Sequence, residues 1–111
     1  MFEKQMQAKQ ELKQAFQDHV LTRMVTENNY KIEENICNLY IVFNSFSIDI
    51  HFNDELTKYF TINEIEDGTK NHVPFSNFSL DKFFTADLTV QILLNLITKL
   101  EKTYALVSLH D

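Results

Sequence analysis

The spacing of apolar residues in this chain changes twice, and this change restricts the possible folds more than any other feature. Near the N-terminus apolar residues recur every fourth position, which predicts an amphipathic helix over roughly residues 3–26. These residues are Ala8, Leu12, Phe16, Val20 and Met24. From Phe46 to Phe52 apolar and polar residues alternate strictly. That alternation is typical of a strand with one buried face.

Helical spacing returns near the C-terminus, where apolar residues step by four and three. They are Ala86, Val90, Leu93, Ile97, Leu100, Tyr104 and Val107. Thr85 or Asp87 can cap the start of this second helix, and Asn28 and Asn29 are suited to end the first. The chain therefore begins and ends with a long helix.

Two hairpins are predicted between the helices. A two-residue loop at Asn44-Ser45 gives a register in which every inward pair is apolar. The pairs are Phe43 with Phe46, Ile41 with Ile48, Leu39 with Ile50 and Cys37 with Phe52. The second loop is Asp67-Gly68, a strong hairpin signal. In its register Glu66 faces Thr69, Ile62 faces Val73 and Phe60 faces Phe75.

These elements predict an α+β fold with a helix, a four-stranded antiparallel meander and a second helix. We expect residues 1–111 to form a single domain with both helices packed on one sheet face. Pro74 places the fourth strand at an edge. The register between the second and third strands stays open, and Tyr30–Ile36 is either a short extra strand or an irregular lead-in.

The net charge is -6, and the chain contains one glycine and one cysteine. The acidic excess lies between the helices, which argues against direct binding to nucleic acid. The first ten residues do not resemble a signal peptide, no segment is predicted to span a membrane, and a lone Cys37 fits a reducing cytoplasm. We therefore expect a cytoplasmic protein.

The sequence lacks the familiar signatures of cofactor and metal sites. A single glycine excludes a Gly-rich phosphate loop and a nucleophile elbow, and Cys37 is expected in the core. The histidines, which have no zinc-ligand spacing, are His19, His51, His72 and His110. We expect no cofactor, no metal and no catalytic residue.

One group of residues keeps an enzymatic alternative open. In the register of the first hairpin Tyr40 faces Asp49, and Asn38 faces His51, all on the outer sheet face. An acid, an imidazole and a phenol together could transfer protons. Cross-strand polar pairs on a solvated face explain the same residues without any reaction.

Two features indicate protein binding. The first is a set of acidic residues at strand ends and loops, namely Glu33, Glu34, Asp54, Glu55, Glu64, Glu66 and Asp67. Such a rim could dock on a basic surface, although acidic loops also serve solubility. The second is an aromatic connection that contains Phe75, Phe78, Phe83 and Phe84. Phe75 and Phe78 could anchor a partner, whereas burial against the sheet is the more common use of such residues.

We therefore expect a non-enzymatic, acidic protein-binding module that docks on a basic surface of another protein. An inhibitor fits this description: a phage anti-defence or anti-CRISPR-like protein, or an immunity protein that neutralises a toxin. The alternatives are a chaperone or adaptor for a partner segment, and a small enzyme or ligand-binding domain on the outer sheet face. The spacing in the second helix also allows a homodimer through the helices.

Overall fold

The computed structural model describes residues 1–23 and 30–110. The expected helix end at Asn28 and Asn29 lies outside this part of the chain. The described residues form an α+β fold of two helices and an antiparallel sheet. The elements are α1 (Glu3–Arg23), β1 (Lys31–Glu34), β2 (Asn38–Val42), β3 (Phe46–Phe52), β4 (Lys58–Glu66), β5 (Thr69–His72), β6 (Phe78–Leu80) and α2 (Ala86–His110).

The sheet is larger than the expected four-stranded meander. Its strands follow the order β1-β2-β3-β4-β5, and β6 pairs separately with β4. One extra strand, β1, comes from the ambiguous segment Tyr30–Ile36. The other arises because the predicted fourth strand is split into β5, beside the second half of β4, and β6, beside its first half.

The first hairpin forms in the predicted register. The Phe43 N–H donates to the Phe46 carbonyl at 2.8 Å across the Asn44-Ser45 loop, and Ile41 pairs with Ile48. At the other end the Phe52 N–H donates to the Cys37 carbonyl at 2.9 Å. These pairs confirm the predicted register. The register is favoured because a slip of one residue would turn every apolar side chain of the hairpin to the outer face.

The second hairpin is confirmed at its turn and wrong further along. Asp67 and Gly68 both have positive φ, 53° and 78°, as a tight two-residue hairpin turn requires, and Glu66 pairs with Thr69. However, Phe60 pairs with Phe78 and not with Phe75. The chain leaves the sheet in a turn over residues 73–76, in which the Ser76 N–H donates to the Val73 carbonyl at 3.3 Å.

The register between β3 and β4, which the sequence left open, runs from Phe46 opposite Glu64 to Phe52 opposite Lys58. The connecting loop is held by the side chain of Asn53. Its Oδ1 accepts hydrogen bonds from the backbone N–H groups of Glu55 (3.0 Å) and Thr57 (2.9 Å). This loop carries Asp54 and Glu55 at one end of the sheet.

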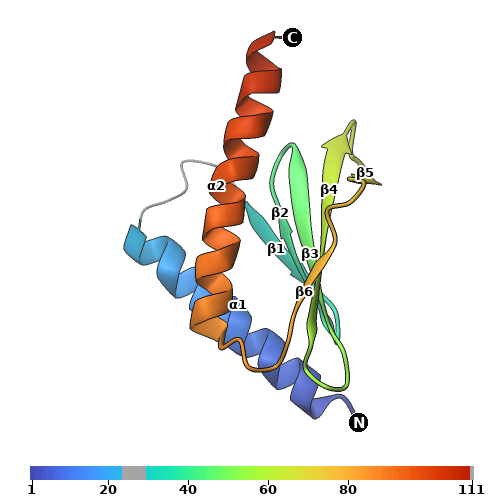
Figure 1. Ribbon diagram of the computed structural model, residues 1–111, viewed down its shortest axis with the longest axis vertical. Helices are drawn as coiled ribbons and strands as arrows, with labels where there is room; N and C mark the ends of the chain where they lie inside the picture. Colours follow the sequence, from blue (N-terminus) through green and yellow to red (C-terminus); the bar gives the residue numbers. More distant parts are fainter. Residues whose placement is uncertain (24–29, 111) are drawn as a thin grey trace.

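Both helices lie on the same side of the sheet, where α1 crosses α2 obliquely (Figure 1). The core between the layers is apolar and includes Leu12, Phe16, Leu39, Ile41, Ile48, Ile50, Phe60, Val90, Leu93 and Ile97. Thr85 caps α2, since its Oγ1 accepts a hydrogen bond from the Leu88 N–H at 3.2 Å. Near the far end of α2, Tyr104 stacks on Phe46 with ring centroids 5.4 Å apart. Neither helix, within the described part, has an apolar stretch long enough to span a bilayer.

Candidate protein-binding surface

The outer sheet face carries the three residues considered for proton transfer, and no helix covers it in Figure 1. Asp49 is bound by its neighbours: Asn63 Nδ2 donates to Oδ2 at 2.9 Å, and Lys70 Nζ and Ser47 Oγ donate to Oδ1 at 3.4 and 3.3 Å. The Lys70 ammonium also lies 4.9 Å from the centre of the Tyr40 ring. Both carboxylate oxygens of Asp49 are therefore occupied by contacts within the sheet.

His51 belongs to a different hydrogen-bonded group. Its Nδ1 donates to Asn38 Oδ1 at 2.7 Å, Asn38 Nδ2 donates to Asn35 Oδ1 at 2.7 Å, and Asn35 Nδ2 donates to the Tyr40 hydroxyl at 3.1 Å. Among the residues that the structure describes, no hydrogen bond joins Asp49 to His51. The predicted register thus places Tyr40, Asp49 and His51 on one face without joining the acid to the imidazole.

The seven acidic residues of the predicted rim do not lie together. Asp54 and Glu55 are in the β3–β4 loop at one end of the sheet, and Glu64, Glu66 and Asp67 are in the β4–β5 hairpin at the other. Glu33 and Glu34 lie on the edge strand β1, where Glu33 pairs with Lys31 at 3.1 Å. The predicted rim is therefore two separate acidic ends and an edge strand.

Glu34 is engaged inside the molecule. Lys13 Nζ donates to its carboxylate at 2.6 Å, Gln10 Nε2 donates at 2.9 Å, and Lys9 Nζ lies 3.2 Å away. The hydrogen bond from Lys13 is the largest cause that lowers the pKa of Glu34 to about 2, and it outweighs the opposing effect of burial. Glu34 therefore connects α1 to β1 rather than presenting a free charge to a partner.

Glu64 also makes an internal contact, because it lies on the helix side of the sheet opposite Phe46. Burial of the Tyr104 phenol, followed by its hydrogen bond to Glu64, raises the pKa of Tyr104 to about 12. Glu66 and Asp67, by contrast, are exposed at the hairpin turn. No salt bridge reaches either of them from the described residues. The tip of the hairpin thus carries two uncompensated negative charges.

The aromatic connection divides into buried and exposed residues. The Phe78 ring stacks on Phe60 at 4.5 Å, with an angle of 3° between the planes. Phe84 is half-buried and Phe83 is 78% exposed. Phe75 is fully exposed and has a φ of 61°. Phe78 therefore seals the sheet edge, while Phe75 projects into solvent.

The conformation of Phe75 is fixed by its turn. Residues 73–76 form a β-turn with Pro74 in the second position and Phe75 in the third, where a positive φ normally selects glycine or asparagine. The Val73 N–H donates to the Ile62 carbonyl at 3.0 Å, and the Ser76 hydroxyl, which donates to the Val73 carbonyl at 2.7 Å, lies 3.3 Å from the same Ile62 oxygen. These bonds hold the turn against β4 and present the ring outward.

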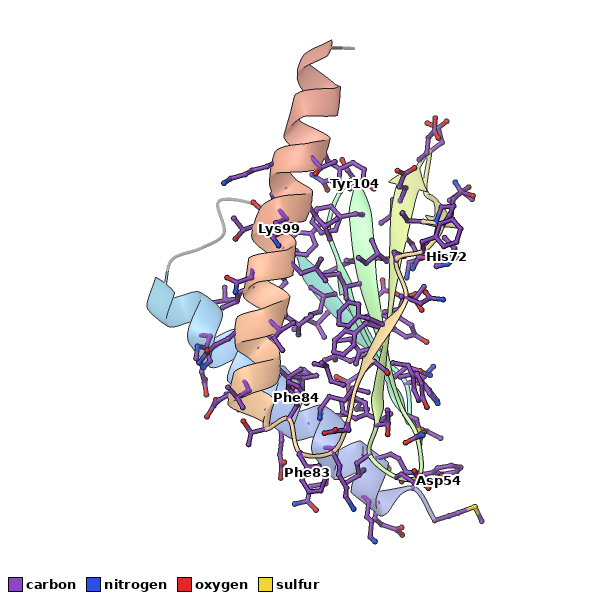
Figure 2. The ribbon with its side chains drawn as sticks, viewed as in Figure 1. Asp54, His72, Phe83, Phe84, Lys99 and Tyr104 are labelled. Carbon is purple, nitrogen blue, oxygen red and sulfur yellow. The ribbon has the colours of Figure 1, made fainter. Side chains whose placement is uncertain are left out.

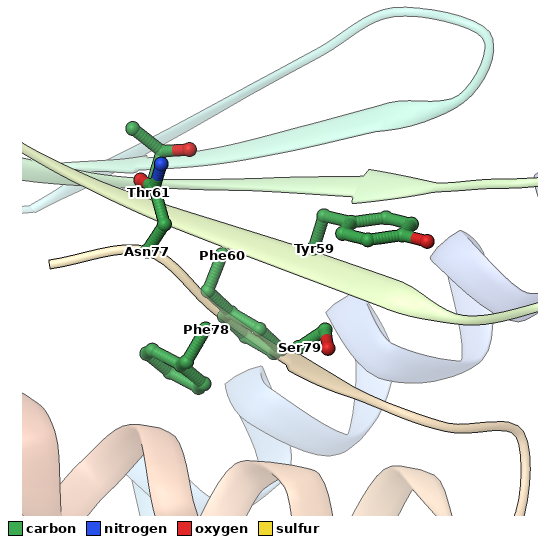
Figure 3. Close-up of a pocket in the computed structure, with 6 residues that line it drawn as sticks. All are labelled: Tyr59, Phe60, Thr61, Asn77, Phe78 and Ser79. Atoms are coloured by element: carbon green, nitrogen blue, oxygen red, sulfur yellow. The ribbon is translucent and has the colours of Figure 1, made fainter. Parts of the chain in front are cut away.

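A shallow groove of about 310 Å³ lies beside this turn, across β4 and β6 (Figure 3). Its lining residues are Tyr59, Phe60, Thr61, Asn77, Phe78 and Ser79. Tyr59 is 46% exposed on the outer side of β4, whereas the Phe78 ring lies on the other side (Figure 3). Sequence reasoning missed this groove. The alternation in β4 could have placed Tyr59 outward, but the pairing of β6 with β4 has no local signal.

Over residues 3–20 of α1 and 86–104 of α2, whose side chains the structure describes, the helices present mainly polar side chains to solvent. On α2 the exposed residues Gln91, Asn95, Lys99 and Lys102 are polar, and Leu88 is 49% exposed. No group of three or more His, Cys, Asp or Glu residues suited to a metal ion occurs in the described residues. Comparisons with protein-family models, with curated proteins and with solved structures found no match for this chain.

Proposed function

We propose that this protein binds a partner protein through the surface formed by Glu66, Asp67 and Phe75, which we call the hairpin edge. The observation that carries the proposal is Phe75. A left-handed backbone costs a residue with a Cβ roughly 1–2 kcal/mol, and the ring of Phe75 is fully exposed, so no burial within the chain offsets that cost. Strained and exposed aromatic residues of this kind are typical of binding sites.

The charge of the hairpin edge indicates the chemistry of the partner. Glu66 and Asp67 lie at one end of β5 and Phe75 lies beyond the other. Asp67 and Phe75 are eight positions apart, which limits their separation to about 26 Å even in a fully extended segment. This span fits within one interface of ordinary size, about 800 Å² per partner. A complementary partner has an apolar pocket for the Phe75 ring, flanked by basic residues that pair with the hairpin tip.

The role we propose is inhibition by occlusion. A basic groove, such as a channel that binds nucleic acid, attracts an acidic surface over long range and accelerates association. Phe75 would then supply the buried contact that slows dissociation, because hot spots are most often aromatic residues or arginine at the centre of an interface. Phage anti-defence proteins and toxin-immunity proteins are the two settings in which we expect such an inhibitor.

The test is affinity capture from the source organism with the full chain immobilised. The wild type is compared with Phe75→Asn, with the double substitution Glu66→Lys and Asp67→Lys, and with Phe83→Asn as a matched control at another exposed phenylalanine. We expect one protein retained by the wild type and by Phe83→Asn, with affinity at least about 30-fold lower for Phe75→Asn. Charge reversal is expected to weaken capture most at low salt. Equal capture by all four proteins would refute the proposal.

A further inference from the structure

A second concave site lies at the opposite end of the sheet from the β4–β5 hairpin. It is a cavity of about 510 Å³ where the N-terminal turn of α1 meets the β3–β4 loop. Its walls include Phe2, Gln5, His51, Phe52, Asp54 and Glu55. Figure 2 shows Asp54 in that loop, beside the start of α1. Three segments that are distant in the sequence therefore contribute to one pocket.

The polar groups that line this cavity are mainly hydrogen-bond acceptors. Gln5 is only 5% exposed, and its Nε2 donates to Asp54 Oδ1 at 2.8 Å. This bond leaves Gln5 Oε1 without a donor from any described residue. Because that oxygen is not sealed from solvent, Gln5 provides an accessible acceptor for a ligand with N–H groups.

His51 adds a further acceptor. Because Asn38 Nδ2 donates to Asn35, the Asn38 oxygen faces the imidazole and accepts a hydrogen bond from His51 Nδ1 at 2.7 Å. The proton of the neutral ring is thereby placed on Nδ1, and Nε2 keeps its lone pair. His51 is exposed and lines the cavity, so this lone pair is accessible to a donor.

The cavity also carries negative charge. Asp54 and Glu55 both line it, and no lysine or arginine within the described ranges makes a salt bridge with either carboxylate. Phe2, which is 41% exposed, supplies the accessible aromatic ring, whereas Phe52 also lines the cavity but is only 1% exposed and belongs to the core. Acceptors, uncompensated carboxylates and an accessible aromatic ring together favour a flat cation with several N–H donors.

We propose that this cavity binds a guanidinium group. A guanidinium presents five N–H donors in one plane, and it stacks on aromatic rings more readily than the compact ammonium of lysine. A divalent metal ion fits less well, since no cluster of three or more metal-ligating side chains occurs within residues 1–23 and 30–110. The inference goes beyond the proposed function, because this cavity and the hairpin edge share no residue.

The test is a titration of the ¹⁵N-labelled full chain followed by NMR. Two guanidinium probes represent the two possible sources: Nα-acetyl-arginine N-methylamide for an arginine side chain of a protein, and agmatine for a free small molecule. Nα-acetyl-citrulline N-methylamide is the neutral control of similar shape. We expect saturable shifts of the Gln5 side-chain amide and of loop residues 53–57, with a dissociation constant on the order of 1 mM for a ligand of this size.

Glu55→Gln is the main variant, because Glu55 is exposed and no described residue makes a salt bridge or a hydrogen bond with its carboxylate. We expect it to weaken binding at least about tenfold, and Asp54→Asn to act similarly while keeping an oxygen for Gln5. Glu11→Gln, at an exposed carboxylate on α1 that does not line the cavity, is the control and should leave the titration unchanged. Binding of either guanidinium probe alone supports the site and identifies its source. Absence of shifts with both probes at 50-fold the expected dissociation constant, on the order of 50 mM, or equal shifts with the citrulline control, would overturn the inference.

Discussion

Substitution of Phe75 by asparagine is expected to stabilise the protein while it weakens partner binding at least about 30-fold. Phe75 has a φ of 61° and a fully exposed ring, so the substitution removes no packing. Asparagine tolerates the left-handed region far better than phenylalanine. Relief of most of the strain should raise the free energy of unfolding by about 0.5–1.5 kcal/mol. For a chain of 111 residues this corresponds to a rise in Tm of about 4 °C per kcal/mol.

The assay is urea unfolding followed by circular dichroism, combined with thermal unfolding. Phe75→Ala is the decisive comparison, because alanine removes the ring but, unlike asparagine, has no particular tolerance of a positive φ. It should leave stability almost unchanged and still weaken binding. Phe83→Asn, at an exposed residue without positive φ, should not stabilise. If Phe75→Asn is no more stable than Phe75→Ala, the backbone at this position is not strained and the reasoning fails.

Three further substitutions test the interior contacts. Glu34→Gln should lower the free energy of unfolding by about 1–2 kcal/mol at pH 7. This loss is smaller than the full pKa shift implies, because the side chain is 30% exposed. Since the pKa of Glu34 is lowered in the folded protein, the difference in free energy of unfolding between wild type and variant should vanish as pH falls from about 4.5 towards 2. A difference that does not change with pH in urea titrations would contradict this. Tyr104→Phe should remove the late phase of tyrosine ionisation near pH 12 in absorbance at 295 nm. Because the folded pKa of Tyr104 is raised, its contribution to stability should be lost between pH 10 and 12; an identical absorbance titration in the variant would show that another tyrosine is responsible. Thr85→Ala should lower the free energy of unfolding by about 1 kcal/mol because it removes the cap of α2, whereas Thr85→Ser should keep the cap and the stability of the wild type. Equal stability of the two variants would contradict the capping account.

The sequence predicts those parts of the fold that depend on local signals. The Asn44-Ser45 hairpin follows from apolar alternation on both sides of the loop, and Asp67-Gly68 follows from the conformational freedom of those two residues. The split of the last strand was missed because no local signal marks it. Pro74 indicates an edge, but nothing local shows that Phe75 takes a left-handed conformation, and an uninterrupted strand would have paired Phe75 with Phe60.

The candidate site was harder to predict from the sequence, because contacts between side chains that are distant in the chain determine which charges are neutralised and which acceptors come together. Glu34 and Glu66 look alike in the sequence, yet Lys13 and Lys9 on α1 neutralise only Glu34. The cavity beside Gln5 has no signal of any kind, since Gln5 reads as an ordinary residue of an amphipathic helix. Only its contact with Asp54, 49 positions away, brings the acceptors together.

The most direct test of partner binding through the hairpin edge is site-specific photo-crosslinking. The photoreactive residue p-benzoylphenylalanine replaces Phe75 in one version of the full chain and Phe83 in another, and each is irradiated in a lysate of the source organism. We predict an adduct with one protein at position 75 that excess unlabelled wild type suppresses and that excess Phe75→Asn does not, with no such adduct at position 83. No adduct at position 75, or the same adduct at both positions, would contradict the account.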